Sequence, residues 1–202
     1  MLLKLCVSAV CILMLGLIGC TPASSMRVMG GVKHNPAEQN ALLNVELGLG
    51  YLAQEQRARA KAKLIHALAL APQLSETQGA MAYFREMVGD YEDAEHFHRK
   101  AIRIATHKGA VSNNYGAYLC RQGKYAAADL AFQQALKDTA YARTAEVFEN
   151  AGLCALKSAT PLDTQTVLKA EHYLTQAIHH DPKREQARVV LETLQKQRRN
   201  LS

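Results

Sequence analysis

The chain has 202 residues, of which 49% are hydrophobic, 6% aromatic and 21% charged, and its formal net charge is +6. An apolar fraction of this size excludes an intrinsically disordered chain, and the scarcity of aromatic residues argues against a β-sandwich or β-barrel. The composition therefore predicts an all-α protein with a core of ordinary size.

The first predicted element is an export signal. Lys4 precedes an apolar run from Leu5 to Ile18, which is too short to span a bilayer and is typical of a secretory signal peptide. The run ends in Leu17-Ile18-Gly19-Cys20, which resembles the lipobox of bacterial lipoproteins, whose cysteine is acylated and becomes the new amino terminus. We expect removal of residues 1–19 and lipid attachment at Cys20; the alternative is a plain signal peptide with a coincidental cysteine.

The residues that follow the signal indicate where the protein is anchored. Two or more acyl chains hold a protein stably on a membrane. Thr21 is not the aspartate that resembles an inner-membrane retention signal, so we expect an outer-membrane lipoprotein that faces the periplasm. Residues 20–39 are rich in Pro, Gly, Ser and Thr and are predicted to form a flexible tether.

A repeat of 34 residues begins at Ala41. Its Leu47-Gly48, Ala60 and Leu64 are matched 34 positions later by Met81-Ala82, Ala94 and His98, and 68 positions later by Tyr115-Gly116, Ala128 and Phe132. A fourth copy has a longer loop near Pro161. This period is typical of tetratricopeptide repeats, which form a right-handed superhelix of stacked helical hairpins. We predict one such domain at 40–202, with about four hairpins and a C-terminal capping helix, at 41–74, 75–108, 109–142, 145–182 and 184–199.

The first helix of each predicted hairpin lines the concave face on which such arrays bind extended peptides or partner helices. We predict a partner-binding groove on this face, formed by Leu42, Val45, Leu49, Leu52, Tyr83, Met87, Asn113 and Arg121. Two alternatives remain open: residues 26–40 fold back over Leu42 and Leu49, or the helical register differs by one position.

Two cysteines fall on the first helices of successive predicted repeats. Cys120 and Cys154 are 34 positions apart, which places them at similar heights on neighbouring helices. An exported protein folds in an oxidising compartment, where nearby thiols tend to pair. The spacing is compatible with a disulfide and also with two buried free thiols.

No catalytic or metal-binding constellation stands out. His96 and His98 diverge on a helix, His179-His180 lies at a helix end, and there is no phosphate loop or Gly-x-Ser-x-Gly. We predict no enzymatic activity, metal, cofactor or small-molecule substrate; a Cys/His pair built on Cys120 or Cys154 is the enzymatic alternative. The basic stretch 183–199 is either a binding surface or the solvated back of the capping helix, and nucleic acid is not an expected partner.

The third and fourth repeats carry a more specific signal. The segment from Asn113 to Tyr125, with Glu149 to Ala155, closely resembles the type IV pilus biogenesis lipoprotein family PilF or PilW, and the resemblance extends from Leu17 to about Pro182. It implies a pilotin, an outer-membrane lipoprotein that escorts secretin subunits so that they assemble into the ring through which the pilus exits. It further implies that Cys20 is acylated and that Cys120 and Cys154 are paired.

A different partner class fits the same architecture. A tetratricopeptide lipoprotein that scaffolds or regulates cell-wall enzymes would have the same signal, lipid anchor and concave face. The sequence does not separate these two binding functions.

Overall fold

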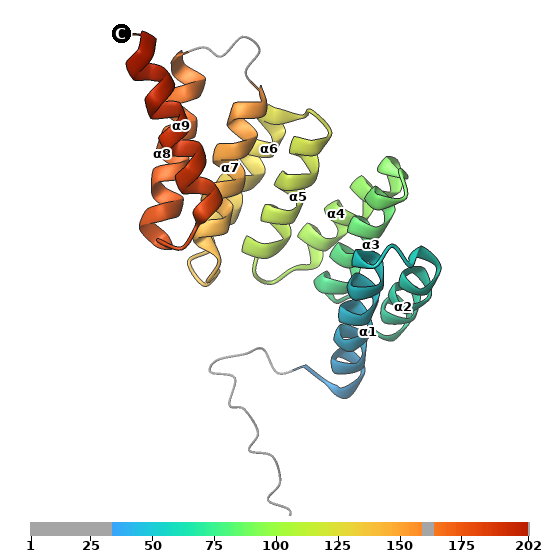
Figure 1. The fold of residues 1–202 in the computed structure, drawn as a ribbon. Coiled ribbons are helices and arrows are strands. Elements are labelled where there is room, and N and C mark those ends of the chain that lie inside the picture. Colours follow the sequence, from blue (N-terminus) through green and yellow to red (C-terminus); the bar gives the residue numbers. More distant parts are fainter. Residues whose placement is uncertain (1–33, 159–163, 202) are drawn as a thin grey trace, which may run out of the picture. The chain divides into compact units, whose positions relative to one another are not determined.

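The computed structural model describes residues 34–158 and 164–201, and the regular structure within these ranges is entirely helical (Figure 1). The prediction of an all-α protein is therefore confirmed. The expected signal peptide, Cys20 and most of the tether lie outside the described residues. The helices are α1 Pro36–Ala53, α2 Arg57–Leu70, α3 Ser75–Met87, α4 Tyr91–Ile104, α5 Gly109–Arg121, α6 Tyr125–Leu136, α7 Thr144–Ser158, α8 Thr164–His180 and α9 Glu185–Leu201.

The helices form a row of hairpins. Each odd-numbered helix from α1 to α7 packs against the helix that follows it, and α1, α3, α5 and α7 also contact one another in sequence. The last helix, α9, packs against α8. The described residues thus contain the four hairpins and the closing helix that the period of 34 predicts. None of these helices is both long and apolar enough to cross a bilayer.

The first helix begins earlier than expected. Asn35 Oδ1 accepts a hydrogen bond from the Glu38 backbone N–H at 2.9 Å, and Glu38 Oε2 accepts one from the Asn35 N–H at 3.0 Å. This capping box, followed directly by Pro36 at the first helical position, starts the helix four residues before the predicted domain boundary at residue 40. Residues 36–39 are therefore helical and are not part of a tether.

Close approach of the two helices in a hairpin depends on glycine in the first helix. A Cβ atom added at Gly48, Gly116 or Gly152 would lie 2.7, 2.7 or 2.9 Å from the nearest atom of Leu64, Phe132 or Leu174, respectively. In the second hairpin Ala82 occupies the equivalent position and is fully buried. These contacts build the core of each hairpin because a large side chain of the second helix fills the space that the small residue leaves.

The same turn ends the first helix of the first three hairpins. Residues 55, 89 and 123 have φ values of +60°, +82° and +72°. The following amide donates to a carbonyl near the helix end, as in Gln56 N–H to Tyr51 O at 2.8 Å and Lys124 N–H to Leu119 O at 2.9 Å. Two of the three residues are Gly89 and Gly123, and Glu55 adopts the left-handed conformation at a cost of about 1–2 kcal/mol.

Candidate protein-binding surface

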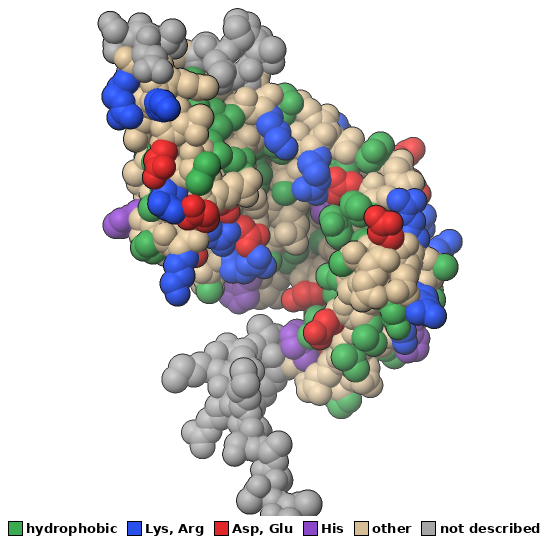
Figure 2. Space-filling model, in the orientation of Figure 1, with side chains coloured by type: hydrophobic (Ala, Val, Ile, Leu, Met, Phe, Trp, Pro, Cys, Tyr) green, Lys and Arg blue, Asp and Glu red, His purple; other side chains and the backbone are tan. Residues whose placement is uncertain are grey.

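The predicted groove residues divide into an exposed set and a buried set. Tyr83 and Met87 on α3 are 41% and 45% exposed, Arg121 on α5 is exposed, and Leu42 on α1 is half-buried. Figure 2 shows hydrophobic side chains gathered over α1 and α3, with charged side chains beside them. We call Leu42, Tyr83, Met87 and Arg121 the groove surface.

The remaining predicted groove residues lie deeper. Val45 and Leu49 are half-buried and pack against the core cluster that contains Leu64, Met81 and Phe84. Leu52 is only 7% exposed and belongs to that cluster itself. The groove assignment of Leu52 is therefore wrong, because its side chain lies in the core between Leu64 of α2 and Met81 and Phe84 of α3.

Asn113 is also a structural residue. It is 1% exposed, its Nδ2 donates to Glu146 Oε1 at 3.1 Å, and its Oδ1 accepts from Asn150 Nδ2 at 3.1 Å. Both partners lie on α7, so Asn113 joins α5 to α7 by hydrogen bonds. A buried amide with satisfied donors and acceptors stabilises an interface and offers little to an incoming peptide.

A bidentate ion pair lies next to the exposed apolar residues. Arg121 donates from Nε to Glu86 Oε1 at 2.6 Å and from Nη2 to Glu86 Oε2 at 2.7 Å. These hydrogen bonds raise the pKa of the Arg121 guanidinium above its usual value. The Glu86 side chain is 7% exposed and that of Arg121 is 45% exposed, so the pair ties α3 to α5 and still presents N–H groups to solvent.

This arrangement fits a peptide better than a small molecule. Tyr83 and Met87 are four positions apart on α3 and therefore share one face of the helix. Two exposed apolar side chains beside a fixed guanidinium are suited to a segment that carries apolar residues and a carboxylate or carbonyl group. The surface is open, and its apolar part lies on a helix held in place by the hairpins on both sides.

The two predicted cysteine partners are bonded to each other. Cys120 on α5 and Cys154 on α7 form a disulfide with a Cα–Cα distance of 5.8 Å, and both residues are buried. The spacing was compatible with a disulfide and with two buried free thiols, and the structure contains the disulfide. Neither sulfur is a nucleophile while the bridge is intact, so a Cys/His catalytic pair has no thiolate to use.

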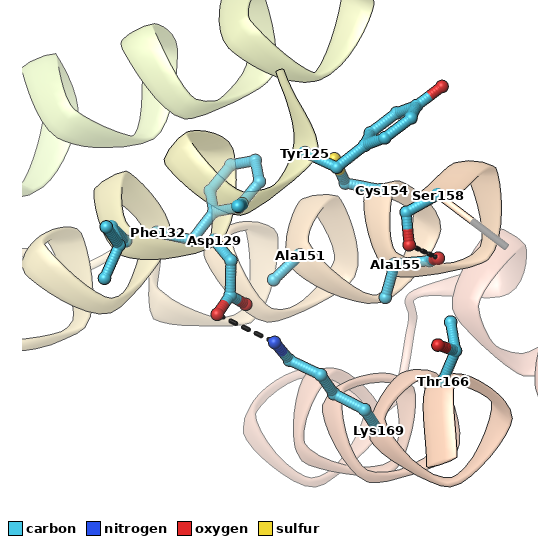
Figure 3. A pocket seen from close by; sticks show the side chains of 11 residues that line it. Tyr125, Asp129, Phe132, Ala151, Cys154, Ala155, Ser158, Thr166 and Lys169 are labelled. Carbon is cyan, nitrogen blue, oxygen red and sulfur yellow. Dashed lines mark hydrogen bonds and ion pairs between the residues drawn. The ribbon is translucent and has the colours of Figure 1, made fainter. Parts of the chain in front are cut away.

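A cavity that the sequence does not indicate lies between α6, α7 and α8. Its volume is about 530 Å³, and its walls include Tyr125, Phe132 and Ala151 (Figure 3). Lys169 Nζ lies 2.7 Å from Asp129 Oδ2 across it, and the Tyr173 hydroxyl donates to Asp129 Oδ1 at 2.9 Å. Burial, with this hydrogen bond, raises the pKa of Tyr173 to about 12. The charged side chains that the structure describes around the cavity, Asp129 and Lys169, are thus paired with each other, and neither marks a ligand site.

Metal ligation has no support in the described ranges, where no group of three or more His, Cys, Asp or Glu side chains comes together. His96 lies on the exposed side of α4, whereas His98 is 3% exposed inside the hairpin. His179 and His180 lie at the end of α8, where the His180 ring stacks on Phe148 with 5.3 Å between ring centres. These histidines occur in separate environments.

Comparison with known proteins identifies relatives of the whole described fold. The chain is 31% identical over 150 residues to the type IV pilus assembly protein PilF of Pseudomonas aeruginosa, a match that covers 74% of this chain and 59% of PilF. The solved structure of Pseudomonas aeruginosa PilF superposes with a TM-score of 0.72 and 25% identity, over 82% of this chain and 72% of that one. The chain is therefore homologous to PilF.

Two further structures share the fold. PilW, described as a widely conserved type IV pilus biogenesis factor, superposes with a TM-score of 0.64 and 24% identity, over 74% of this chain and 66% of PilW. YrrB, a tetratricopeptide-repeat protein with a peptide-binding site, superposes with a TM-score of 0.57 and 18% identity, over 75% of this chain and 74% of YrrB. No protein-family model matches the chain. The tetratricopeptide fold expected from the period of 34 is thus confirmed.

Proposed function

We propose that this homologue of PilF is an outer-membrane lipoprotein of type IV pilus biogenesis that acts as a pilotin. It binds secretin subunits and promotes their localisation and multimerisation in the outer membrane. The observation that carries the proposal is the homology to PilF, which covers 74% of this chain in sequence and 82% in structure. Its similarity to PilW, a type IV pilus biogenesis factor, supports the same role.

The groove surface supplies the means of binding. Tyr83 and Met87 together offer two large apolar side chains that are 41% and 45% exposed in the free protein. Covering the exposed part of each with a partner segment contributes up to about 1 kcal/mol, since full burial of such a side chain is worth about 1.5–3 kcal/mol. The Arg121 guanidinium, held by Glu86, is positioned to receive a hydrogen-bond acceptor of that segment without having to be ordered first.

The acyl group at Cys20 is the second half of the proposed mechanism. A secretin subunit bound to the groove surface is carried to the membrane that holds the lipid anchor, and faces the periplasm there. Binding and anchoring are separate functions in this scheme, so they are separable by mutation.

The test is a gel assay of secretin multimers in unboiled samples from cells that carry variants of this gene. The double variant Tyr83→Glu, Met87→Glu is expected to lose multimers while the protein itself stays at normal levels, because both side chains are exposed. Leu168→Glu with Val189→Glu, which places the same two charges on exposed apolar positions of α8 and α9, is the matched control and is expected to leave multimers unchanged. Leu49→Glu is a poorer probe, since Leu49 packs against the core.

Cys20→Ala tests the anchor. We expect the variant protein to become soluble in the periplasm and secretin multimers to form outside the outer membrane or to be lost. Normal multimers in the Tyr83→Glu, Met87→Glu strain would contradict the proposed groove. Recovery of cell-wall hydrolases or synthases, and no secretin, after cross-linking to the wild-type protein would assign the chain to the cell-wall scaffold class instead.

A further inference from the structure

The amino-terminal end of the hairpin row leaves an inter-hairpin surface uncovered. In the second and third hairpins the first helix buries its side against the preceding hairpin: Thr77, Met81 and Val111 are 0%, 2% and 8% exposed. The positions equivalent to Thr77 and Met81 in α1 are Leu43 and Leu47, one repeat of 34 residues earlier. They are 54% and 41% exposed, because no hairpin precedes α1 in the described structure.

The second helix of the first hairpin, α2, differs in sequence from its counterpart α4 in the second hairpin. Phe97 on α4 packs against the core cluster of the first hairpin, and its equivalent on α2 is Lys63. Arg59 lies one turn before Lys63, with its guanidinium 5.7 Å from the centre of the Tyr51 ring on α1. Lys63 thus stands where the second hairpin has an apolar residue, and Arg59 stands where it has Asp93. We call Leu43, Leu47, Arg59 and Lys63 the end face.

The charge on α2 has one sign. This helix carries Arg57, Arg59, Lys61 and Lys63 and no acidic residue, and none of the four is ion-paired with a carboxylate of the described chain. Lys and Arg side chains gather along the edge of the molecule where α2 lies (Figure 2). The acidic residues of the hairpin are Glu38, Glu46 and Glu55. Glu46 is exposed on α1 beside Leu47, so the end face carries this one acidic group next to the basic side chains of α2.

We infer that the end face lies against an anionic lipid bilayer. A surface with two exposed leucines beside unpaired Lys and Arg is the composition that a membrane interface accepts, since the leucines enter the acyl boundary and the bases reach the lipid phosphates. A second copy seated on the same face would oppose basic α2 helices, and another repeat would bury Lys63 in an apolar interface. Both are disfavoured by the residues present.

The inference rests on the proposed function in one respect, the lipid anchor. Cys20 precedes the first described residue, His34, by only 14 positions in the sequence, so an acyl group there keeps the amino-terminal hairpin near the bilayer. The consequence is an oriented protein. The end face meets the lipid, while Tyr83 and Met87 of the groove surface, on the next hairpin, stay accessible to a partner.

The test measures vesicle binding without the acyl chain. The chain from residue 20 onward, with Cys20→Ala, is sedimented with vesicles of phosphatidylethanolamine and phosphatidylglycerol and with vesicles of phosphatidylcholine alone. We expect binding to the anionic vesicles only, weakened by added salt. The double variant Arg59→Gln, Lys63→Gln is expected to lower the partition coefficient by about 25-fold, since each basic residue near an anionic surface contributes about fivefold.

The matched control removes the same charge elsewhere. Arg103→Gln with Lys137→Gln changes two exposed bases, on α4 and just after α6, and is expected to bind as the parent does. Leu43→Ser with Leu47→Ser is expected to weaken binding and to leave its salt dependence unchanged. Thermal unfolding of each variant verifies that the exposed substitutions preserve the fold.

Three outcomes overturn the inference: equal binding to both kinds of vesicle, an equal loss in the Arg103→Gln, Lys137→Gln control, or self-association that Leu43→Ser, Leu47→Ser abolishes without any vesicle binding. The secretin assay keeps the two proposals distinguishable. Loss of vesicle binding in Arg59→Gln, Lys63→Gln bears only on the end face, whereas loss of multimers in Tyr83→Glu, Met87→Glu bears only on the groove surface.

Discussion

His98 is a buried histidine at a position where the repeat places a large apolar residue. Its equivalents are Leu64 and Phe132, both fully buried, and His98 itself is 3% exposed between the rings of Tyr115 and Tyr118. The ring centres lie 5.6 and 4.9 Å away, and Nε2 has no hydrogen-bond partner among the described residues. Burial lowers the pKa of His98 from 6.5 to about 4. The side chain is therefore neutral in the folded protein at pH 5.

This shift predicts a loss of stability in mild acid. The unfolded chain takes up a proton at His98 near pH 6.5 and the folded chain only near pH 4, so stability is complete above 6.5 and falls as the pH decreases towards 4. We expect the wild type to lose about 2 kcal/mol of unfolding free energy between pH 7 and pH 5 through this group. His98→Phe, which restores the repeat pattern, should remove that loss in urea titrations at the two pH values.

His96→Phe is the control for the His98 prediction, because His96 is exposed on the same helix. The Glu95 carboxyl nearby has its pKa lowered to about 2, first by its hydrogen bond to Lys124, so it does not titrate in this window. The same slope of stability against pH in wild type and His98→Phe would show that other groups carry the acid sensitivity.

Gly116 is the residue that sets the distance between α5 and α6. A Cβ there would lie 2.7 Å from Phe132 Cε1 and 2.8 Å from Cδ1, and the ring is fully buried. We predict that Gly116→Ala lowers the unfolding free energy by about 1–3 kcal/mol through overpacking. Gly50→Ala on α1 meets nothing within 4 Å and should be neutral or stabilising by up to about 1 kcal/mol. Chemical denaturation of the two variants provides the comparison, and equal stabilities would refute the packing argument.

At the scale of the elements, α5 and α7 are joined both by a disulfide and by side-chain hydrogen bonds. The disulfide between Cys120 and Cys154 closes a loop of 34 residues, and the Asn113 hydrogen bonds to α7 lie on the same helix as Cys120. In the chain-entropy description a loop of this size contributes roughly 3–4 kcal/mol. We therefore predict that Cys120→Ser with Cys154→Ser lowers the unfolding free energy by about this amount.

Two measurements check the disulfide prediction. Without reductant, alkylation of the native protein should add no mass at these two cysteines. After reduction, alkylation should add mass at both. Denaturation of the double serine variant should show the lower stability. Alkylation of both thiols without reductant would refute the bridge.

The sequence predicts the hairpins well because their determinants are local. Small residues such as Gly48 and Gly116, and turn glycines such as Gly89, recur at a fixed spacing and specify each helix and turn directly. Leu52 was misplaced because a helical period does not reveal which neighbouring helix covers a given stripe. Asn113 was misplaced because its partners Glu146 and Asn150 lie 33 and 37 positions away, and no local pattern joins them.

The end face and the α6–α8 cavity could not be predicted from periodicity alone. Leu43 and Leu47 fit the repeat pattern, and only the absence of a preceding hairpin in the described structure exposes them. The cavity that Phe132 and Ala151 line arises from the way three helices meet, which follows from packing and not from spacing. Homology to PilF adds what neither periodicity nor packing supplies, the biological process that the proposed function builds on.

At the scale of the whole array, stability passes from hairpin to hairpin and depends on how the last one is closed. Leu174, Ala177, Ala187 and Leu194 form a buried cluster between α8 and α9. Since each hairpin contacts only its neighbours, damage to this cluster should first release the C-terminal helices.

Leu194→Ala tests this closure. Leu194 is 7% exposed, and its truncation should cost about 2–4 kcal/mol. Hydrogen exchange should accelerate in α7, α8 and α9 and stay unchanged in α1 to α4. Val189→Ala on the exposed side of α9 should change the unfolding free energy by no more than about 0.5 kcal/mol and should leave hydrogen exchange unchanged. Uniform acceleration along all described helices would show that the array unfolds as one cooperative unit.

The contrast between the two ends of the described array has a consequence for protein engineering. A designed hairpin joined ahead of Pro36 would meet Leu43 and Leu47 already in place, and replacement of Glu46, Arg59 and Lys63 by apolar residues would remove the charged groups from the junction. Extension beyond α8 would first require removal of α9, which occupies the corresponding site there. The array is thus extensible in one direction, and its binding specificity is open to redesign by grafting new modules upstream.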